Sequence, residues 1–437
     1  MTRRPDEDAA GFDPVLAVER LGGATSFLFQ RFDPVTRRPR RTVAGLEVEI
    51  IGADDDFATA LRRAEALGDR DGGATACLVF AGFETLAGRP AAAAALPGYL
   101  ILRVVEGFDI DHGRGVARLI GADPSLRTKL SMLGAAHDGG PACAAAGDGA
   151  ARAGDDGSIN GWAADMDRAG HARRVAAVKN AVAAGTVEGA VLSLGLSRPS
   201  AARPFPLYRA FVVANPSPYG FVLNHRGAAL VGSSPLAFLN LAGRRLHLET
   251  DAGTRRVSGE AARDDAAATD LMGNPKDAAE HRVVVEAERE ALATIAQGGR
   301  VDCVIDREVR RFSHVMHLYS ALEANLSDAC DLADAIVALA PAAAVSGRPK
   351  RAAAQLGVDL EGAPRGPYGG IVGLVEPGRA DLAAVIRSLW LAGGRAALRV
   401  GGKIVAGSTA DDEYDEAMAK ARFLVDGVAR AELAASG

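Results

Sequence analysis

Few cysteines and no long apolar run occur in this chain, and both absences narrow its class. Only four cysteines occur among 437 residues, scattered and without CxxC spacing, which is typical of reduced thiols rather than a disulfide framework. No apolar run reaches about 18 residues, so we predict no membrane-spanning helix. The N-terminus turns acidic at Asp6 and Glu7, where a signal peptide needs an apolar region. We therefore expect a cytoplasmic protein.

Strong charge of one sign is also missing. The 50 basic and 55 acidic residues nearly cancel, giving a net charge of -5, and no basic stretch predicts a nucleic-acid surface. The short segment Arg37–Arg41 lies between apolar runs and is typical of a solvated turn. With 48% hydrophobic residues, the chain can bury a sizeable core, and we predict a soluble α/β or α+β protein.

The composition divides the chain into three parts. Residues 1–133 mix short strand-like runs with one helical segment at Phe57–Leu67. Residues 134–161 are rich in glycine and alanine and carry few groups able to build a core, which predicts a linker or loop. Residues 162–437 alternate strand-like runs, turns and helical segments.

The end of the chain shows the clearest strand pattern. Tyr368–Val375, Ala380–Leu391 and Ala396–Ala406 are predicted strands joined by PGR and GGR turns. An amphipathic helix is predicted from Asp411 to Ala434. Many strands with short connections and interspersed helices favour antiparallel sheets covered by helices over a parallel array.

Two helical segments carry paired carboxylates. Glu413, Glu416 and Lys420 are spaced three and four residues apart, so they share one helix face. Asp277 and Glu280 repeat the three-residue spacing on an earlier helix. A solvated ion-pair ladder is the ordinary interpretation of such a face. If the two helices meet, their oxygens could hold Mg²⁺, which binds through one or two carboxylates plus a substrate anion.

Three further residues have both a structural and a functional interpretation. Arg387 interrupts the apolar run LAAVIRSLWL, and a buried arginine needs an anion, either a protein carboxylate or a ligand. Tyr368 lies among four glycines, which would let the backbone approach a ligand, although a tight strand entry fits as well. His317, in SHVMHLY, could equally be a core histidine.

Eight segments in order carry a resemblance. They are FPLYRAFVVANPSPYGFVLN (205–224), GSSPLAF (232–238), DAGTRR (251–256), NPKDAAEH (274–281), SHVMHL (313–318), AVSGRPK (344–350), PRGPYGGIVG (364–373) and GGKIVAGSTADDEYDEAMAK (401–420). In order and spacing they resemble the C-terminal core of chorismate-utilising enzymes, which include anthranilate, aminodeoxychorismate, isochorismate and salicylate synthases. NPSPY and HVMH look most like the large subunit, component I, of anthranilate synthase.

The resemblance implies a fold and a set of ligands. The fold would be α/β (α+β), with two large antiparallel β-sheets packed in a sandwich and helices outside. Residues 162–437 would form the chorismate-binding catalytic core, and residues 1–133 an N-terminal α/β part of the same fold. Chorismate would lie between the sheets with Mg²⁺ on its ring carboxylate. A glutamine amidotransferase subunit is a possible partner.

Residue roles follow by position from the same resemblance. The metal ligands would be Glu280 and Glu416, with Asp277 and Glu413 as outer companions. The substrate would be held by Gly253, Thr254, Tyr368, Arg387 and the backbone of Gly401. Catalysis would involve His317, Lys420 and, at positions where the chain departs from the family, Asp251 or Lys403.

Five positions depart from the family pattern. Leu236 replaces the glutamate that protonates the departing C4 hydroxyl, a contribution typically worth about 10²–10⁴-fold in rate. Gly189 replaces the glutamine or lysine whose lysine form activates water in salicylate and isochorismate synthases. Ala344 replaces a threonine. Lys403 stands where a glycine is expected, and Asp251 where an apolar residue is expected.

These departures leave two hypotheses open. Ala252 occupies the position of the aminodeoxychorismate synthase lysine, which argues against that branch. The first hypothesis is an enzyme in which a nucleophile adds at C2, the C4 hydroxyl leaves and pyruvate is eliminated, with His317 assisting proton movement. The second is a diverged, non-catalytic relative that binds chorismate or a partner subunit. A purely structural alternative predicts that Arg387 pairs with a protein carboxylate.

Overall fold

The computed structural model describes residues 7–8, 12–70, 76–89, 96–133, 159, 161–214, 217–311 and 315–436. The predicted linker at 134–161 lies outside the described residues, apart from Ile159 and Gly161. Within the described part of the chain, no helix is long and apolar enough to span a membrane.

Helices and strands alternate along the whole chain. The strands are β1 Glu7–Asp8, β2 Thr25–Phe32, β3 Pro39–Ile50, β4 Cys77–Ala81, β5 Tyr99–Asp111, β6 Val116–Ile120, β7 Ala163–Ala164, β8 Gly189–Pro199, β9 Tyr219–His225, β10 Ala228–Ser234, β11 Ala237–Ala242, β12 Arg245–Arg256, β13 Asp302–Arg311, β14 Val315–Asn325, β15 Gly347–Arg348, β16 Ile371–Glu376, β17 Arg379–Ala384, β18 Ser388–Ala392 and β19 Arg395–Ile404. The helices are α1 Pro14–Leu21, α2 Phe57–Arg70, α3 Phe83–Leu86, α4 Leu126–Met132, α5 Arg168–Ala183, α6 Pro204–Ala214, α7 Ala261–Gly273, α8 Pro275–Ala293, α9 Leu332–Leu339, α10 Lys350–Glu361 and α11 Ala410–Ser436, with a 3₁₀ turn at Gln297–Gly299.

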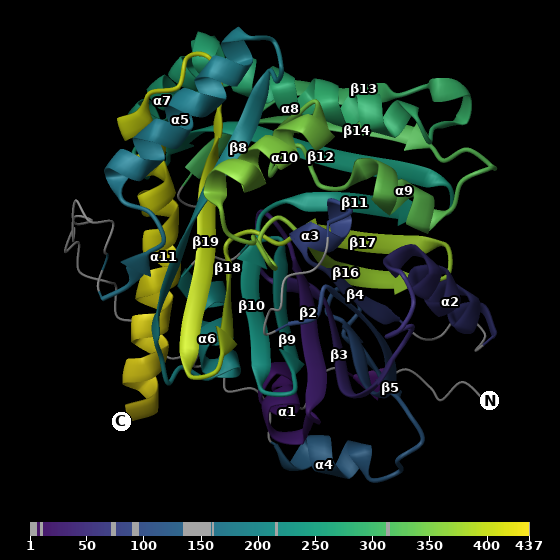
Figure 1. Ribbon diagram of the computed structural model, residues 1–437. Helices are drawn as coiled ribbons and strands as arrows, with labels where there is room; N and C mark the ends of the chain where they lie inside the picture. Colours follow the sequence, from purple (N-terminus) through teal and green to yellow (C-terminus); the bar gives the residue numbers. More distant parts are fainter. Residues whose placement is uncertain are drawn as a thin grey trace.

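Fifteen of the described strands form one antiparallel ladder bent into two layers, while β6 attaches to β5, β1 to β6, and β7 and β15 to β8. Its order is β13-β14-β12-β11-β17-β16-β4-β5-β3-β2-β9-β10-β18-β19-β8. In Figure 1 the strands β8, β9, β10, β18 and β19 run across the direction of β11, β12, β14, β16 and β17. The predicted mixed fold with antiparallel sheets is confirmed. The N-terminal strands β2–β5 join the two layers into a single hydrogen-bonded sheet.

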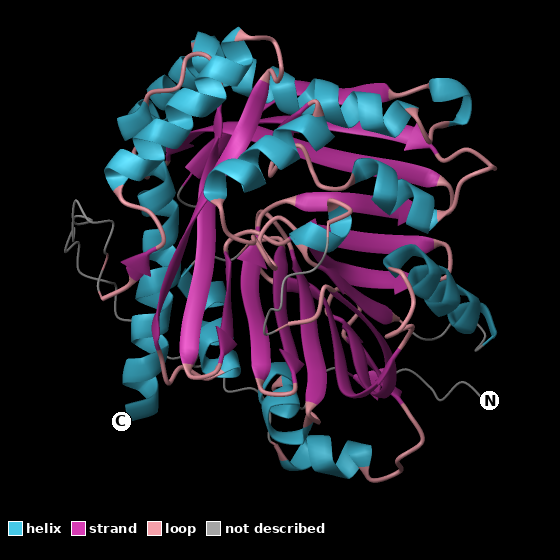
Figure 2. Cartoon of the chain, viewed as in Figure 1, coloured by secondary structure: helices cyan, strands magenta, loops and turns pink. Residues whose placement is uncertain are grey.

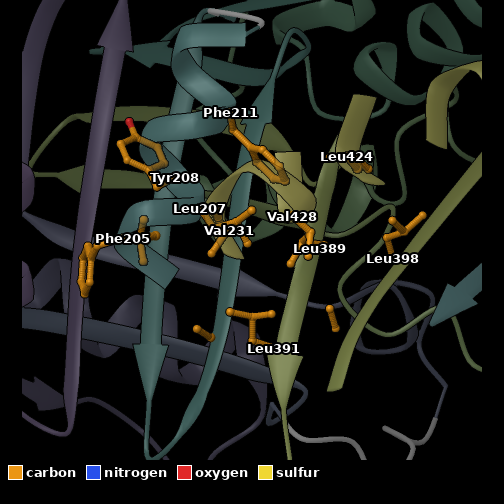
Figure 3. Close-up of a cluster of buried hydrophobic side chains, with 14 of the residues drawn as sticks. Phe205, Leu207, Tyr208, Phe211, Val231, Leu389, Leu391, Leu398, Leu424 and Val428 are labelled. Atoms are coloured by element: carbon orange, nitrogen blue, oxygen red, sulfur yellow. The ribbon is translucent and has the colours of Figure 1, made fainter. Parts of the chain in front are cut away.

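Helices cover the outside of both layers, as Figure 2 shows. One core lies where α6 and α11 pack on β10, β18 and β19. Figure 3 shows Phe211 of α6, Leu424 of α11 and Leu398 of β19 among the side chains that fill it. Burying a side chain of this size stabilises the fold by about 1.5–3 kcal/mol. This core fixes α11 against β19, the strand that carries Gly401 and Lys403.

The second acidic helix, α8, packs on β12 and β14. Asn274 caps its start by accepting hydrogen bonds from the backbone N–H groups of Lys276 and Asp277, and Pro275 occupies the first turn, where proline costs no hydrogen bond. The helix predicted in this part of the sequence is therefore present. Its first two turns present Asp277 and Glu280.

The prediction of one continuous strand at Ala380–Leu391 is wrong. The structure divides it into β17 and β18, with Val385–Arg387 between them, and Arg387 has a left-handed φ of 48°. The apolar run LAAVIRSLWL continues on both sides of this break, so the sequence pattern did not reveal it. A left-handed conformation costs a non-glycine residue about 1–2 kcal/mol.

Candidate active site

The two acidic helices meet. Lys276 at the start of α8 forms a 2.9 Å ion pair with Glu413 in the first turn of α11. The structure thereby brings into contact the two helices that carry Asp277, Glu280, Glu413 and Glu416, which spacing alone could not show.

The outer carboxylates are buried and already neutralised. Asp277 pairs with Arg255 at 2.7 Å, and Glu413 pairs with Lys276. The exposed fractions of Asp277 and Glu413 are 5% and 2%. Because each charge is satisfied by a basic group, these two residues tie α8 to β12 and to α11.

The inner carboxylates, Glu280 and Glu416, differ in their surroundings. Burial raises the pKa of Glu280 to about 7, an effect that Lys403 opposes and that Glu416 and Glu413 increase. The Glu416 carboxylate accepts a 2.8 Å ion pair from Lys420, which lowers its pKa. The side chains of Glu416 and Lys420 stay 40% and 37% exposed, so solvent or a ligand can reach this end of the cluster.

Strand β19 brings two basic groups to the carboxylates. Lys420 Nζ donates a 3.0 Å hydrogen bond to the backbone oxygen of Gly401, which ties α11 to β19. Lys403, two residues further on, is only 5% exposed. Burial lowers the pKa of Lys403 to about 8, and Glu280 is the largest charge acting in the opposite direction.

A bulge in β12 holds the predicted ring-binding turn. The register between β12 and β14 shifts between Ala252 and Thr254, and Gly253 has a φ of 73°. A Cβ atom at Gly253 would lie 3.0 Å from the Cβ of Asp277. Glycine therefore lets the bulge contact α8 and brings the turn beside the carboxylates.

His317, on β14, faces this bulge. Its Nδ1 lies 3.0 Å from the Gly253 backbone oxygen and 3.1 Å from Thr254 Oγ1. A carbonyl oxygen only accepts, so we assign the proton of the neutral ring to Nδ1, leaving Nε2 as its basic nitrogen. Burial lowers the pKa of His317, an effect that Asp251 opposes.

Asp251 lies on β12 opposite Tyr319 of β14. Its charge acts on His317, Arg387 and Lys403 together. This departure from the family pattern therefore places an additional carboxylate among the site's basic groups.

Arg387 lies half-buried at the break between β17 and β18. Burial lowers its pKa, and Asp251 opposes this effect. Among the described residues, no carboxylate comes within 4.0 Å of its guanidinium. The structural alternative, in which a protein carboxylate pairs with Arg387, is thus not what the structure shows. Strained backbone conformations of this kind concentrate at functional sites.

Tyr368 is buried in the turn before β16, beside a network that sequence reasoning missed. The preceding Arg365 is fully buried and donates to both carboxylate oxygens of Glu361, at 2.9 and 2.6 Å, and to the backbone oxygens of Val345 and Val191. In the sequence, the arginine of PRGPYGG is the residue that could have indicated this network. The network fixes the turn that carries Tyr368.

The replaced positions have closed-in surroundings. Leu236 is buried, and its backbone oxygen accepts a hydrogen bond from Ala384 just before the Arg387 turn. A Cβ atom at Gly189 would lie 3.0 Å from the Ile404 backbone oxygen, so a long side chain has little room there. Ala344 precedes Val345, whose oxygen accepts from Arg365.

The donor set suits a hard cation only in part. In the part of the chain that the structure describes, no three His, Cys, Asp or Glu groups lie together as a metal-binding cluster. Glu280 and Glu416 offer oxygen ligands, and the Glu416 charge acts on Glu280. Mg²⁺ is commonly held by two carboxylates and a substrate anion, so these residues fit a cation that the substrate completes.

Two neutralising residues could not be found from spacing. Lys276 precedes Asp277 in sequence but pairs with Glu413 of the other helix, and Arg255 reaches Asp277 from β12. NPKDAAEH and DAGTRR contain both residues, yet nothing in either segment indicates a partner so distant in sequence.

Comparison with known proteins assigns the chain to a class. The model of the chorismate binding enzyme family matches residues 42–426, which is most of the chain. The protein belongs to this family. The resemblance seen in the sequence is confirmed.

Individual relatives show which members of the family the chain resembles. The chain is 36% identical over 282 residues to anthranilate synthase component 1 of Streptomyces coelicolor, covering 64% of this chain and 55% of the relative. It is 38% identical over 265 residues to a component 1 of Haloarcula marismortui, covering 60% and 54%. The matched region thus spans about half the length of each relative.

Solved structures show the same fold. Anthranilate synthase component I from Streptococcus pneumoniae superposes with a TM-score of 0.72 at 24% identity, covering 97% of this chain and 99% of that one. The menaquinone-specific isochorismate synthase from Escherichia coli gives a TM-score of 0.74 at 19% identity, covering 97% and 94%.

Proposed function

We propose that this protein is a chorismate-consuming lyase similar to anthranilate synthase component I, which adds ammonia to the ring and releases pyruvate. The observation that carries the proposal is Arg387, a half-buried guanidinium in a strained turn with no protein carboxylate within 4.0 Å. A carboxylate of the substrate would supply the missing anion.

The chain's own groups suggest how each part of the reaction proceeds. Arg387 and the Tyr368 turn would bind the enolpyruvyl carboxylate, and the Gly253 bulge would line the ring. Mg²⁺ bound at Glu280 and Glu416 would neutralise and polarise the ring carboxylate. His317 Nε2 would accept the C2 proton when the ring becomes aromatic, because its Nδ1 proton is held by Gly253.

Ammonia comes from outside this chain in the proposal. A glutamine amidotransferase subunit would supply it, as the likeness to anthranilate synthase component 1 suggests. Gly189, which replaces a water-activating lysine, favours amination over the water addition of isochorismate synthases. A cytoplasmic location is part of the same proposal.

Leu236 favours a second candidate, a chorismate-binding relative without turnover. An apolar side chain cannot protonate the departing C4 hydroxyl, and that loss costs typically about 10²–10⁴-fold in rate. Asp251, whose charge reaches His317 and Arg387, is the acid available to replace it.

Product analysis distinguishes the two candidates. Pure protein is incubated with chorismate, Mg²⁺ and ammonium, with isochorismate as the alternative substrate, and products are identified by mass spectrometry. We expect loss of chorismate with equal amounts of pyruvate and an aminated aromatic product, reduced in Asp251→Asn. Saturable chorismate binding without any product would establish the binding candidate instead.

A further inference from the structure

Lys403 is the basic residue of the site that the family pattern leaves unexplained. It lies on β19, opposite Val191 of β8, in a position where a glycine is expected. Its side chain is buried, yet among the described residues no carboxylate comes within 4.0 Å of its ammonium. A lysine ammonium is strongly hydrated, so placing it there without a direct partner is costly.

Three consecutive residues of β19 line the carboxylate cluster. Gly401 accepts the hydrogen bond from Lys420, and a Cβ atom at Gly402 would lie 2.9 Å from Glu413 Oε2. Lys403 follows directly. Because successive side chains of a strand point to opposite faces, Lys403 points away from Glu413, and the charges that act on it come from Glu280 and Glu288 of α8 and from Asp251 of β12. The backbone at Lys403 is fixed by pairing with β8.

Glu280 is the carboxylate whose charge acts most strongly on Lys403. The opposing charges on Lys403 are, in order, Glu280, Glu288 and Asp251. Glu288 is already engaged, since its oxygens accept from Lys350 Nζ at 2.6 Å and from the Ala343 N–H at 2.5 Å. Glu280 has no such direct partner among the described residues, so it is the carboxylate left to act on the Lys403 ammonium.

We propose that Lys403 acts as a built-in counter-cation of the substrate site. Its ammonium weakens the binding of a divalent cation at Glu280 and Glu416, and it binds the substrate's ring carboxylate itself. The proposal rests on the proposed function for the identity of that substrate. Two like charges in one partly dehydrated site repel strongly, so the ammonium and Mg²⁺ compete for the same carboxylates. This chain therefore depends less on the metal than a relative with glycine at this position.

Titration calorimetry with Mg²⁺ alone tests the competition without any turnover. The variants are Lys403→Met, which keeps the stem and removes the charge, and Lys403→Arg, which keeps the charge. Lys129→Met is the matched control, because it removes one positive charge from the exposed, remote helix α4. We expect Mg²⁺ to bind Lys403→Met about tenfold or more tightly than the wild type, and Lys403→Arg and Lys129→Met to match the wild type.

A second readout covers substrate dependence and folding. Thermal unfolding with and without Mg²⁺ should show a larger stabilising shift for Lys403→Met than for the wild type. Chorismate affinity should depend on Mg²⁺ more steeply in Lys403→Met. Lys403→Gly replaces Lys403→Met if the latter does not unfold cooperatively.

The outcomes separate this proposal from the proposed function. Equal Mg²⁺ affinity in the wild type and in the uncharged variants, or no Mg²⁺ binding by any of them, overturns the role of Lys403 even if chorismate is consumed. If the uncharged variants bind Mg²⁺ more tightly but the protein does not bind chorismate, the role of Lys403 as a counter-cation is supported and the substrate that we assign to it is wrong.

Discussion

A single arginine separates the functional from the structural interpretation of this site. Arg387 has a left-handed backbone and a half-buried charge without a carboxylate within 4.0 Å among the described residues. Both features cost stability. A structural role would pair this dehydrated charge with a protein carboxylate, so the side chain is expected to bind a ligand's anion.

The first prediction concerns Arg387→Gly. Because glycine relieves the strained φ and removes a dehydrated charge, the variant should melt at a higher temperature than the wild type while its chorismate affinity falls about 100-fold. Differential scanning fluorimetry and equilibrium binding measure the two effects. Arg226→Gly is the control, since Arg226 has the same φ of 48° in the exposed β9–β10 hairpin.

The control isolates the backbone contribution. Arg226→Gly should change the melting temperature less than Arg387→Gly and leave chorismate affinity unchanged. A destabilised Arg387→Gly variant that still binds chorismate normally would show that the arginine is structural.

The second prediction concerns the inner carboxylates. Glu280→Gln and Glu416→Gln should each weaken Mg²⁺-dependent chorismate binding by about tenfold or more, because each removes a charged oxygen ligand. Equilibrium binding at several Mg²⁺ concentrations measures the effect. Glu376→Gln, on β16 and paired with Arg41, is the control. If both inner variants bind chorismate as well as the wild type, the metal assignment is wrong.

At the scale of elements, helices α5 and α11 meet through a buried histidine. The ring of His171 packs edge-on against Tyr414 at 5.5 Å. Burial, reinforced by Arg174 and Arg168, lowers the pKa of His171 to about 4. In the unfolded chain the pKa is about 6.5. As the pH falls through this interval, the unfolded chain binds a proton that the folded ring does not, so stability falls.

The third prediction follows from that sign. His171→Phe keeps the ring contact and removes the titrating group. When the pH falls from 7 to 5.5, its free energy of unfolding should therefore decrease by about 1 kcal/mol less than that of the wild type. Urea unfolding at both pH values measures the difference. Parallel pH dependence of the two proteins would mean that His171 is protonated in the folded state.

The elements show what sequence patterns can and cannot predict. Spacing placed Asp277 with Glu280, and Glu413 with Glu416, on helix faces, because helical period is a local property. The meeting of α8 and α11 depends on contacts distant in sequence, and only the family resemblance indicated it. The break at Arg387 was missed because the apolar run continues on both sides of this single left-handed residue.

On the scale of the whole molecule, the N-terminal strands are part of the sheet that carries the site. Strand β4 pairs with β16 and β2 pairs with β9, so strands of residues 1–133 fill the gap between two sets of strands of residues 162–437. The family resemblance implied that residues 1–133 are part of the same fold, but not that they lie between strands of residues 162–437, because such pairings leave no local signal.

The fourth prediction is that residues 162–437 alone will not fold. Removing β2–β5 exposes β9 and β16 as unpaired edges, which promote aggregation. Expression of this fragment should give aggregated protein without a cooperative thermal transition by circular dichroism, whereas the full chain should unfold in one transition. A monomeric fragment that melts cooperatively near the full chain's temperature would show independent domains.

Equilibrium dialysis of chorismate against the wild type and Arg387→Gln tests the central claim most directly, which is that the arginine and the two acidic helices surround one dianionic ring compound. We expect one chorismate per wild-type chain in the presence of Mg²⁺, and about 100-fold weaker binding to the variant. Equal binding by the two proteins, or no binding by the wild type, would contradict the account.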